Sequence, residues 1–406
     1  MVVVSLLAFI AVLAPIKVEI KDGRLLRAGK PFLIKGAGGS HSLEVLADSG
    51  GNSIRTWGAD NALEVLDRAQ KHGLTVTLGI WLGHKEHGFK YDDPAQTSQQ
   101  LKKSLSAVAK LKDHPALLMW GIGNEMEGYD GGGDPKVWSA VEEIAKEIKK
   151  LDPNHPTMTV VAEIGGERVS AIHKHCPNID VIGINSYGGA PSLPERYAKA
   201  GGTKPYVITE FGPLGQWECG KTPWGSPIEM TSTEKAEFYK RSFQANAKCS
   251  LSLGSYAFLW GNKQEATSTW FGMFLKDGTR LGAVDTMANL WRGSYPDNRV
   301  PEISAVSLIG PNKVQAGAIV EVQLGVKDPE GDRLETEWYV QAEQSKPGVG
   351  GQNESLPEIV LGSMLKTSVA GATVKAPTAK GAYRVFVIVR DGQGGGATAN
   401  LPFLVD

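Results

Sequence analysis

The chain has 406 residues, and 43 Lys and Arg against 44 Asp and Glu give it a formal net charge of −1. It contains no basic block and no RNA-module signature, which argues against nucleic acid as its main partner. Its 41% of apolar residues can bury a core and exclude a disordered chain, and the length allows a catalytic domain of ~250–300 residues with a smaller one beside it.

Residues 2–14 form one apolar run that is too short to span a membrane. The run resembles the core of a secretory signal peptide. We therefore expect residues 1–16 to be a leader and the protein to be secreted or periplasmic, without a stable membrane span. A buried N-terminal strand is the alternative interpretation.

The three cysteines, Cys176, Cys219 and Cys249, are too few for a scaffold built on disulfides. Cys219 and Cys249 can pair, but free thiols are the main expectation.

A repeating pattern of strands and helices occupies residues 17–294. It opens with a β-hairpin over residues 17–26, around Asp22-Gly23, a pair that favours a type I′ turn. Eight strand-like apolar runs then alternate with helical segments. The runs cover residues 32–35, 53–57, 75–81, 117–122, 157–161, 181–185, 206–209 and 255–260.

Two of the intervening helices carry start signals. Asp134 is a good N-cap, and Pro135 follows it at the first helical position. Apolar residues then keep to one helical face as far as Leu151. Thr231, with Glu234 three residues later, resembles a capping box.

Eight alternating units predict an α/β fold in which a parallel sheet closes into a (β/α)8 TIM barrel. The competing fold is a doubly wound nucleotide-binding sheet, which needs a glycine-rich phosphate turn after an early strand. Only residues 36–39, Gly-Ala-Gly-Gly, come near that motif, and they lack its third glycine and its ribose-binding acid.

The pattern changes near residue 295, where a linker begins. Residues 300–406 show no convincing helix, and short β-runs at 302–309, 319–327, 336–340, 382–390 and 401–405 alternate with Gly, Pro and Asp turns. This predicts a C-terminal immunoglobulin-like β-sandwich without a disulfide. The turns around Asp328, Asp332 and Asp391 resemble polycystic-kidney-disease and cadherin-like modules. These residues can bind calcium, but turn chemistry accounts for them, and we expect no metal site.

Two glutamates end apolar runs that lie 85 residues apart, in Trp120-Gly-Ile-Gly-Asn-Glu125 and in Tyr206-Val-Ile-Thr-Glu210. All strands of a TIM barrel open onto one face at their carboxyl ends, so the two glutamates can converge there. With roughly 30 residues per unit, they follow the fourth and the seventh strand. Cleavage of a glycosidic bond needs two carboxylates, one held as an acid and one ionised.

Five motifs in chain order then carry a family resemblance: GGNSIRTWG, GIGNEMEG, INSYGG, VITEFG and YAFLWG, at strands 2, 4, 6, 7 and 8. On these motifs residues 17–293 resemble a clan A retaining β-glycoside hydrolase, similar to families 2 and 5. A barrel with one immunoglobulin-like domain behind it is also similar in architecture to family 158 endo-β-1,3-glucanases.

The resemblance implies a role for each matching residue. Glu125, which follows Asn124, matches the acid/base, and Glu210 matches the nucleophile, with the two carboxyl groups ~5–5.5 Å apart. Asn124 is implied to bind the 2-hydroxyl of the sugar. Arg55 would keep Glu210 ionised, and Tyr187 would donate its phenol to Glu210.

Plainer interpretations of these residues stay open. The glutamates can be ordinary salt-bridged residues, Asn124 a turn cap, Arg55 part of a generic ion pair and Tyr187 a core residue. Glu127 and Glu163, near the same face, are expected to be solvated or hydrogen-bonding residues and not catalysts. No serine-hydrolase elbow, phosphate loop or Cys-x-x-Cys pair occurs.

Aromatic and histidine side chains near the strand ends predict sugar contacts. Trp260 resembles the indole platform under the reacting sugar, because apolar sugar faces stack on flat indoles. Trp57, Trp81 and Trp217 can line further subsites or pack in the core. His84 is expected to bind a sugar hydroxyl and not a metal, because the helical His-Glu-x-x-His spacing is absent.

The sequence thus predicts a retaining β-glycosidase that needs no cofactor and acts on a β-linked polysaccharide or oligosaccharide, with endo-β-1,3-glucanase as the first candidate. Family 2 enzymes normally carry sandwich domains before the barrel, whereas this barrel begins near residue 17. That favours an endo-acting enzyme or a β-glucan transglycosylase over an exo-acting β-glycosidase or mannanase. A non-catalytic carbohydrate-binding protein is the last alternative.

Overall fold

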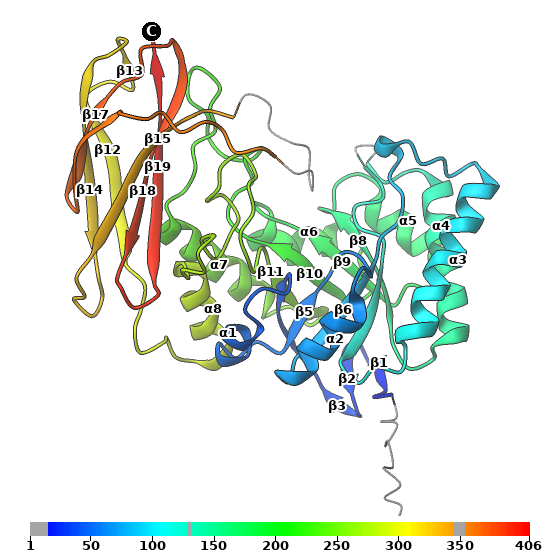
Figure 1. Cartoon of the computed structure of the whole chain (residues 1–406). Coiled ribbons are helices and arrows are strands. Elements are labelled where there is room, and N and C mark those ends of the chain that lie inside the picture. The colour runs from blue at the N-terminus through cyan, green and yellow to red at the C-terminus, as the bar shows by residue number, and fades with distance from the viewer. Residues whose placement is uncertain (1–14, 129–130, 345–353) are drawn as a thin grey trace, which may run out of the picture.

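The computed structural model describes residues 15–128, 131–344 and 354–406. Figure 1 shows two parts beside each other, a barrel ringed by helices and a β-sheet part that holds the C-terminus. The expected leader lies almost wholly outside the described residues and stays a prediction. None of the helices in the described ranges is both long enough and apolar enough to cross a membrane.

Eight parallel strands close into a barrel in the order β10–β11–β4–β5–β6–β7–β8–β9, which confirms the predicted fold. The last strand ends at residue 257, so Trp260 lies beyond it and not at its tip. The strands are β4 (Ile34–Gly38), β5 (Ser53–Arg55), β6 (Thr75–Ile80), β7 (Leu117–Ile122), β8 (Thr157–Ala162), β9 (Val181–Asn185), β10 (Tyr206–Phe211) and β11 (Ser252–Ala257).

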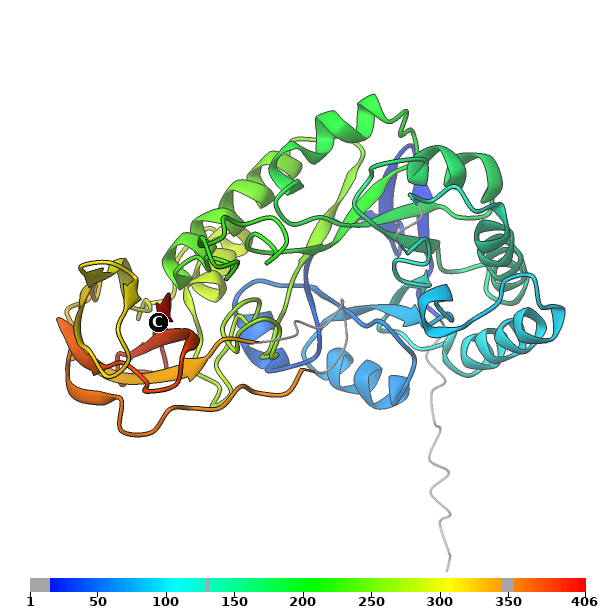
Figure 2. The same cartoon turned by 90° about the horizontal axis from the view of Figure 1, so that it is seen from above.

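Helices follow the barrel strands and form the outer ring that Figure 2 shows from above. The two predicted helix starts are confirmed: Asp134 accepts a hydrogen bond from the backbone of Lys136, and Thr231 with Glu234 forms a capping box. The helices are α1 (Leu43–Asp48), α2 (Ala62–Lys71), α3 (Pro94–Leu111), α4 (Pro135–Leu151), α5 (Arg168–His175), α6 (Leu193–Lys199), α7 (Ser232–Asn246) and α8 (Gly282–Arg292), with short 3-10 turns at Lys85–His87 and Ala190–Ser192.

A small antiparallel sheet closes the amino-terminal end of the barrel. It consists of β1 (Val18–Lys21), β2 (Arg24–Arg27) and β3 (Lys30–Pro31), and it appears below the barrel in Figure 1. Asp22 and Gly23 have φ values of 51° and 72°, the positive values that a type I′ turn requires, so the predicted hairpin is confirmed. Val18 and Leu25 bury their side chains against the lower barrel core.

A tyrosine crosses the inside of the barrel at the height of Gly36. Tyr256 is fully buried, and its hydroxyl lies 2.9 Å from Ser53 Oγ and 2.5 Å from Thr77 Oγ1. A Cβ atom on Gly36 would lie 2.3 Å from the Tyr256 ring, so glycine is required there for steric reasons. Residues 36–39 therefore serve barrel packing and not phosphate binding.

The C-terminal part, which we call the two-sheet unit (residues 302–405), consists of two four-stranded sheets with strand orders β12–β14–β17–β16 and β13–β19–β18–β15. Its own core lies between the sheets and includes Trp338, Val340 and Phe403. The strands are β12 (Glu302–Ile309), β13 (Lys313–Val314), β14 (Ile319–Lys327), β15 (Glu335–Ala342), β16 (Met364–Ser368), β17 (Gly371–Lys375), β18 (Gly381–Arg390) and β19 (Gly396–Val405).

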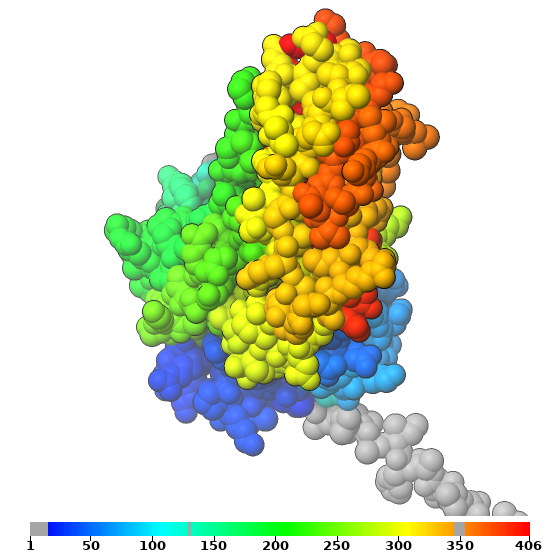
Figure 3. Space-filling view, turned by 90° about the vertical axis from the view of Figure 1, so that its left-hand side faces the viewer, coloured from blue at the N-terminus to red at the C-terminus, as the bar shows by residue number. Residues whose placement is uncertain are grey.

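Strands β13, β16 and β17 were not predicted from the sequence. Strand β16 is an edge strand whose residues 365–368 are all exposed, so it lacks the apolar alternation by which strands are recognised. Figure 3, viewed from the side of the two-sheet unit, shows this unit packed against the barrel. Strands β12 and β19 contact α7.

Candidate active site

Glu210 lies near the end of strand β10, and its carboxylate is surrounded by hydrogen-bond donors. Its Oε1 atom accepts hydrogen bonds from Arg55 Nη1 at 2.9 Å and from Trp57 Nε1 at 2.7 Å, and its Oε2 atom accepts one from the Tyr187 hydroxyl at 2.7 Å. Arg55 is 2% exposed and Glu210 is 6% exposed. A carboxylate can accept at both oxygens, so three donors, one of them a guanidinium, are an environment suited to the ionised form.

Tyr187 stays a donor in this arrangement. Burial, together with the charge of Glu210 and the hydrogen bond to it, raises the pKa of the Tyr187 phenol well above its ordinary value. The phenol therefore remains protonated and keeps its proton directed at the Glu210 carboxylate.

Glu125 follows β7 and has a different environment. Its φ of 54° is unusual for a residue other than glycine, and its backbone N–H donates to Val160 of β8 at 2.8 Å. Burial and, after it, the negative charge of Glu210 together raise the pKa of Glu125 to about 7, although a hydrogen bond from Asn185 opposes the shift. A carboxyl group with this pKa can both give and take a proton near neutral pH.

Asn185, at the end of β9, links the two glutamates. Its Nδ2 atom donates to Glu125 Oε1 at 2.6 Å and to Asn124 Oδ1 at 3.2 Å, and its Oδ1 atom accepts from Thr209 at 2.8 Å. Arg55 Nη2 also donates to Asn124 Oδ1, at 2.5 Å. Sequence reasoning missed Asn185, although it lies inside the INSYGG motif directly before Ser186 and Tyr187.

The prediction that Trp260 forms the indole platform under the sugar is wrong. Trp260 is 1% exposed and packs among the rings of Phe274 and Trp291, the latter on α8, so it cannot stack on a sugar. Phe258 is the aromatic residue that follows β11 next to the site. Its ring lies 5.8 Å from that of Trp57 and 5.9 Å from that of Tyr187.

An aromatic wall lies beside Glu210, and we define it as Tyr187, Trp217, Phe258, Trp270 and Phe271. Four of these residues form a buried cluster, and Trp57 packs against it. Trp217 is the exposed member, at 57%, with its ring 5.7 Å from Tyr187 and 6.1 Å from Phe271.

A second exposed tryptophan lies in the loop after β6. Trp81 is 49% exposed, and the ring of His84 stacks on it with a centroid distance of 4.9 Å. Burial and the neighbouring His87 lower the pKa of His84. Its Nε2 atom is buried and has no hydrogen-bond partner in the described part of the chain. His84 therefore lies where we predicted it, although what it binds stays a prediction.

Two further carboxylates lie near the glutamate pair, each with an arginine partner. Glu127 is buried, and its Oε1 atom accepts from Arg168 Nε at 2.9 Å and from the backbone of Ala162 at 2.7 Å. Glu163 accepts from Arg196 Nη1 at 2.6 Å and from the Ser186 hydroxyl. Both are hydrogen-bonding residues, as expected: Glu127 is buried, whereas the side chain of Glu163 is 33% exposed.

No cluster of three or more His, Cys, Asp or Glu side chains suited to a metal occurs within the described residues. In the two-sheet unit, Asp328 accepts hydrogen bonds from the backbone of the turn that follows it, and Asp391 does the same in its own turn. The three cysteines, all in the described part, are free thiols.

The fold and the site together define a class: glycoside hydrolase barrels that carry paired glutamates after their fourth and seventh strands. The sequence matches the glycosyl hydrolases family 2, TIM barrel domain, over residues 18–220, which is half of the chain. The chain therefore belongs to this family.

Known relatives agree with this assignment. A β-glucuronidase from Paenibacillus borealis is 23% identical over 328 residues, and the match covers 69% of this chain and 52% of the relative. A β-galactosidase from Photobacterium profundum is 26% identical over 182 residues, covering 40% and 16%. The chain thus spans about half the length of the first relative and less of the second.

Solved structures show the same fold. The β-D-glucuronidase of Dictyoglomus thermophilum has a TM-score of 0.55 at 20% identity, with 70% of this chain and 54% of that chain covered. A family 2 β-galacturonidase from Eisenbergiella tayi has a TM-score of 0.54 at 20% identity, with 70% and 55% covered.

Proposed function

We propose that this chain hydrolyses β-glycosidic bonds with retention of configuration at the anomeric carbon. The observation that carries the proposal is the contrast between two linked carboxyl groups. Glu210 accepts three hydrogen bonds, one from a guanidinium, whereas the pKa of Glu125 is raised to about 7. A retaining mechanism needs this division between an ionised nucleophile and a protonated acid.

The reaction has two displacements. In the first, a Glu210 oxygen attacks the anomeric carbon, the bond from that carbon to the leaving oxygen breaks, and Glu125 gives its proton to that oxygen. In the second, Glu125 takes a proton from water, the water oxygen attacks the same carbon, and Glu210 is released as a carboxylate.

Asn124 is suited to hold the 2-hydroxyl of the sugar. Its Oδ1 atom accepts from both Arg55 and Asn185, so the amide is held with its NH2 group directed elsewhere. That group is then a donor for a substrate hydroxyl. Trp57, whose N–H donates to Glu210, and Phe258 offer apolar surface beside the same carboxylate.

The identity of the sugar is a separate part of the proposal. The relatives named above are a β-glucuronidase, a β-galactosidase and a β-galacturonidase, so single β-linked glycosyl residues are the first substrates to consider. Trp81 and Trp217, which are 49% and 57% exposed, favour a second candidate, an endo-acting β-1,3-glucanase or a related transglycosylase. Exposed indoles can stack on further sugar units of a chain.

We further propose that the two-sheet unit is an immunoglobulin-like sandwich. Its two four-stranded sheets around one apolar core support that assignment.

A substrate panel tests the proposal. It comprises the 4-nitrophenyl β-glycosides of glucose, galactose, mannose, glucuronic acid and galacturonic acid, with laminarin, lichenan and mannan. The wild type should release product from at least one of these, and proton NMR should show the β-anomer first. Glu210→Gln should lose at least about 10³-fold in kcat while keeping the wild-type thermal unfolding curve.

Glu125→Ala separates the acid role from general damage. We expect slow turnover of natural glycosides and nearly unchanged formation of the glycosyl-enzyme from activated aryl glycosides, because a good leaving group needs little acid help. Equal losses on both substrates would contradict the acid role. An α-anomer as first product would contradict retention, and products longer than the substrate would favour the transglycosylase.

A further inference from the structure

A buried ion pair lies where the barrel meets the two-sheet unit, away from the glutamate pair. Glu229, in the loop after β10, is 7% exposed, and Lys235 of α7 is 6% exposed. Lys235 Nζ lies 2.5 Å from Glu229 Oε1 and also donates to the backbone carbonyl of Thr269 at 2.6 Å. Burial opposes ionisation of Glu229, but Lys235 and the surrounding donors hold its pKa below the ordinary value.

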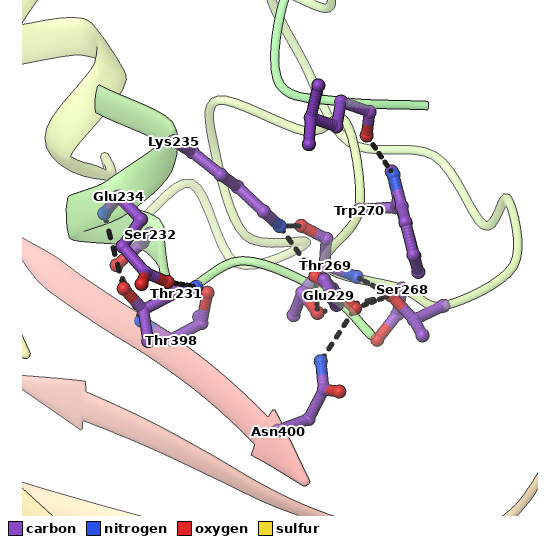
Figure 4. Close-up of polar contacts among 12 residues, drawn as sticks. Glu229, Thr231, Ser232, Glu234, Lys235, Ser268, Thr269, Trp270, Thr398 and Asn400 are labelled. Carbon is purple, nitrogen blue, oxygen red and sulfur yellow. Dashed lines mark hydrogen bonds and ion pairs between the residues drawn. The ribbon is translucent and has the colours of Figure 1, made fainter. Parts of the chain in front are cut away.

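Glu229 collects donors from three separate segments. Besides Lys235, it accepts from Thr269 Oγ1 at 2.8 Å and Thr267 Oγ1 at 2.6 Å, both in the loop after β11, and from Asn400 Nδ2 of β19 at 2.6 Å. Figure 4 shows Lys235, Thr269 and Asn400 directed toward Glu229. Both carboxylate oxygens thus have two donors each, so the carboxylate is fixed in position.

Strand β18 of the two-sheet unit reinforces this contact. Arg384 is 1% exposed, and its Nη1 atom donates to Asn400 Oδ1 at 2.6 Å, which directs the Asn400 amide toward Glu229. Arg384 Nη2 also donates to the backbone carbonyl of Pro227, in the loop that carries Glu229. On the other loop, the backbone N–H of Ala266 donates to Glu354 at 2.9 Å.

The two loops held in this way carry all members of the aromatic wall except Tyr187. Thr267 and Thr269 directly precede Trp270 and Phe271, and Trp270 Nε1 donates to the backbone carbonyl of Leu214 at 2.9 Å, which ties the two loops together. Trp217 lies between Leu214 and Glu229 in sequence and rests on Phe271. A displacement of Glu229 would therefore also displace residues of the aromatic wall beside Glu210.

A buried ion pair is not needed to hold the barrel and the two-sheet unit together. Desolvation largely cancels the attraction within a buried ion pair, and apolar residues would often hold such an interface as well. A pair with every polar atom satisfied does, however, define one arrangement of the groups around it.

We propose that Asn400 and Arg384 are positioning residues of the glycosidase site, which fix through Glu229 the loops that present Trp217 to the part of the substrate beyond the cleaved sugar. This inference rests on the proposed function. It makes the two-sheet unit a determinant of specificity for longer substrates, although none of its described residues donates a hydrogen bond to the glutamate pair.

Asn400→Leu tests the proposal, because leucine keeps the branched shape and the number of side-chain heavy atoms and removes the amide donor. Ser232→Ala is the matched control: it removes the 2.9 Å bond from the backbone of Thr398 to Ser232 Oγ, a contact between the same strand and α7 that does not touch Glu229. Trp217→Ala is the reference for loss of the platform. The substrates are laminaritetraose and 4-nitrophenyl β-D-glucoside, or the matching pair for whichever sugar the wild type cleaves.

We expect Asn400→Leu to raise KM for the oligosaccharide by about tenfold, because displacement of a positioned group by about 1 Å can cost up to a hundredfold. kcat for the aryl glycoside should stay within about twofold. Hydrogen–deuterium exchange should rise in residues 213–229 and 262–272, and Ser232→Ala should show neither change. If Asn400→Leu does not fold, Arg384→Gln replaces it with the same expectations.

Unchanged exchange in both loops would overturn the proposal, as would equal kinetic losses on both substrates. Failure of the proposed function gives a different result. A wild type that cleaves no glycoside would remove the specificity role, while the exchange experiment would still decide whether Asn400 holds the loops.

Discussion

Asn185 donates a 2.6 Å hydrogen bond to Glu125, the carboxyl group whose pKa is raised to about 7. This bond favours the ionised form of Glu125 and opposes the effect of burial. The same amide group also donates to Asn124 at 3.2 Å. One side chain thus adjusts the acid and orients the residue proposed to bind the sugar.

Replacement of Asn185 by alanine should therefore change the pH profile as well as the rate. Glu125 must be protonated to act as the acid, so activity falls as pH rises through its pKa. Loss of the donor raises that pKa, and the alkaline limb of kcat should move to higher pH. We expect kcat/KM to fall by about a hundredfold because Asn124 is no longer aligned. An alkaline limb that moves to lower pH would contradict the assignment.

Glu127→Gln should move the alkaline limb the other way. The charge of Glu127 raises the pKa of Glu125, so its removal should bring the limb to lower pH, with the bond to the Ala162 backbone still possible through the amide oxygen. Glu163→Gln is the matched control. Glu163 follows the neighbouring strand β8 and also pairs with an arginine, but it is not among the groups that shift the pKa of Glu125. Its limb should stay at the wild-type position.

Arg55→Lys should be strongly impaired despite keeping the charge. Arg55 donates to Glu210, to Asn124 and to the backbone carbonyl of Thr209 from one planar group. An ammonium cannot reach all three at once. We expect kcat/KM to drop by about a hundredfold, measured on the best aryl glycoside, with a circular dichroism spectrum like that of the wild type. A variant within twofold of wild type would show that the guanidinium geometry is dispensable.

Unfolding in urea should distinguish two of the four tryptophans that the sequence placed in contact with the sugar. Trp260→Ala removes a fully buried indole from the core, and the free energy of unfolding should fall by about 3–5 kcal/mol. Trp217→Ala removes an exposed indole and should change it by no more than about 0.5 kcal/mol. Equal effects would contradict the placement of Trp260 in the core.

The barrel could be predicted because its evidence is local. Each strand is a short apolar run, and helix starts such as Asp134 and Thr231 have their own signals. The positions of Glu125 and Glu210 follow from strand order alone, since all strands of such a barrel end on one face. The ion pair between Arg55 and Glu210, also expected, is present in the structure.

The features that were predicted wrongly or missed have a common cause. Each of them depends on contacts between segments that are distant in the sequence. Trp260 lies three residues past the end of β11, where strand alternation no longer fixes the direction of a side chain. Asn185 gains its importance from Glu125, which follows β7, and Thr209 on β10, and no local pattern reveals either partner. The Glu229 junction joins residues up to 171 positions apart, so sequence spacing gives no hint of it.

Tyr256 has one more consequence for the proposed chemistry. Its ring lies across the barrel interior above an apolar layer that includes Ile34, Met119 and Val207, and the small sheet of β1–β3 covers the end below. In the described part of the chain, packed side chains thus fill the barrel interior around and below Tyr256. Water for the second displacement must enter by the mouth through which the leaving group departs. The two events are consequently ordered in time, and a leaving group that lingers protects the glycosyl-enzyme from hydrolysis.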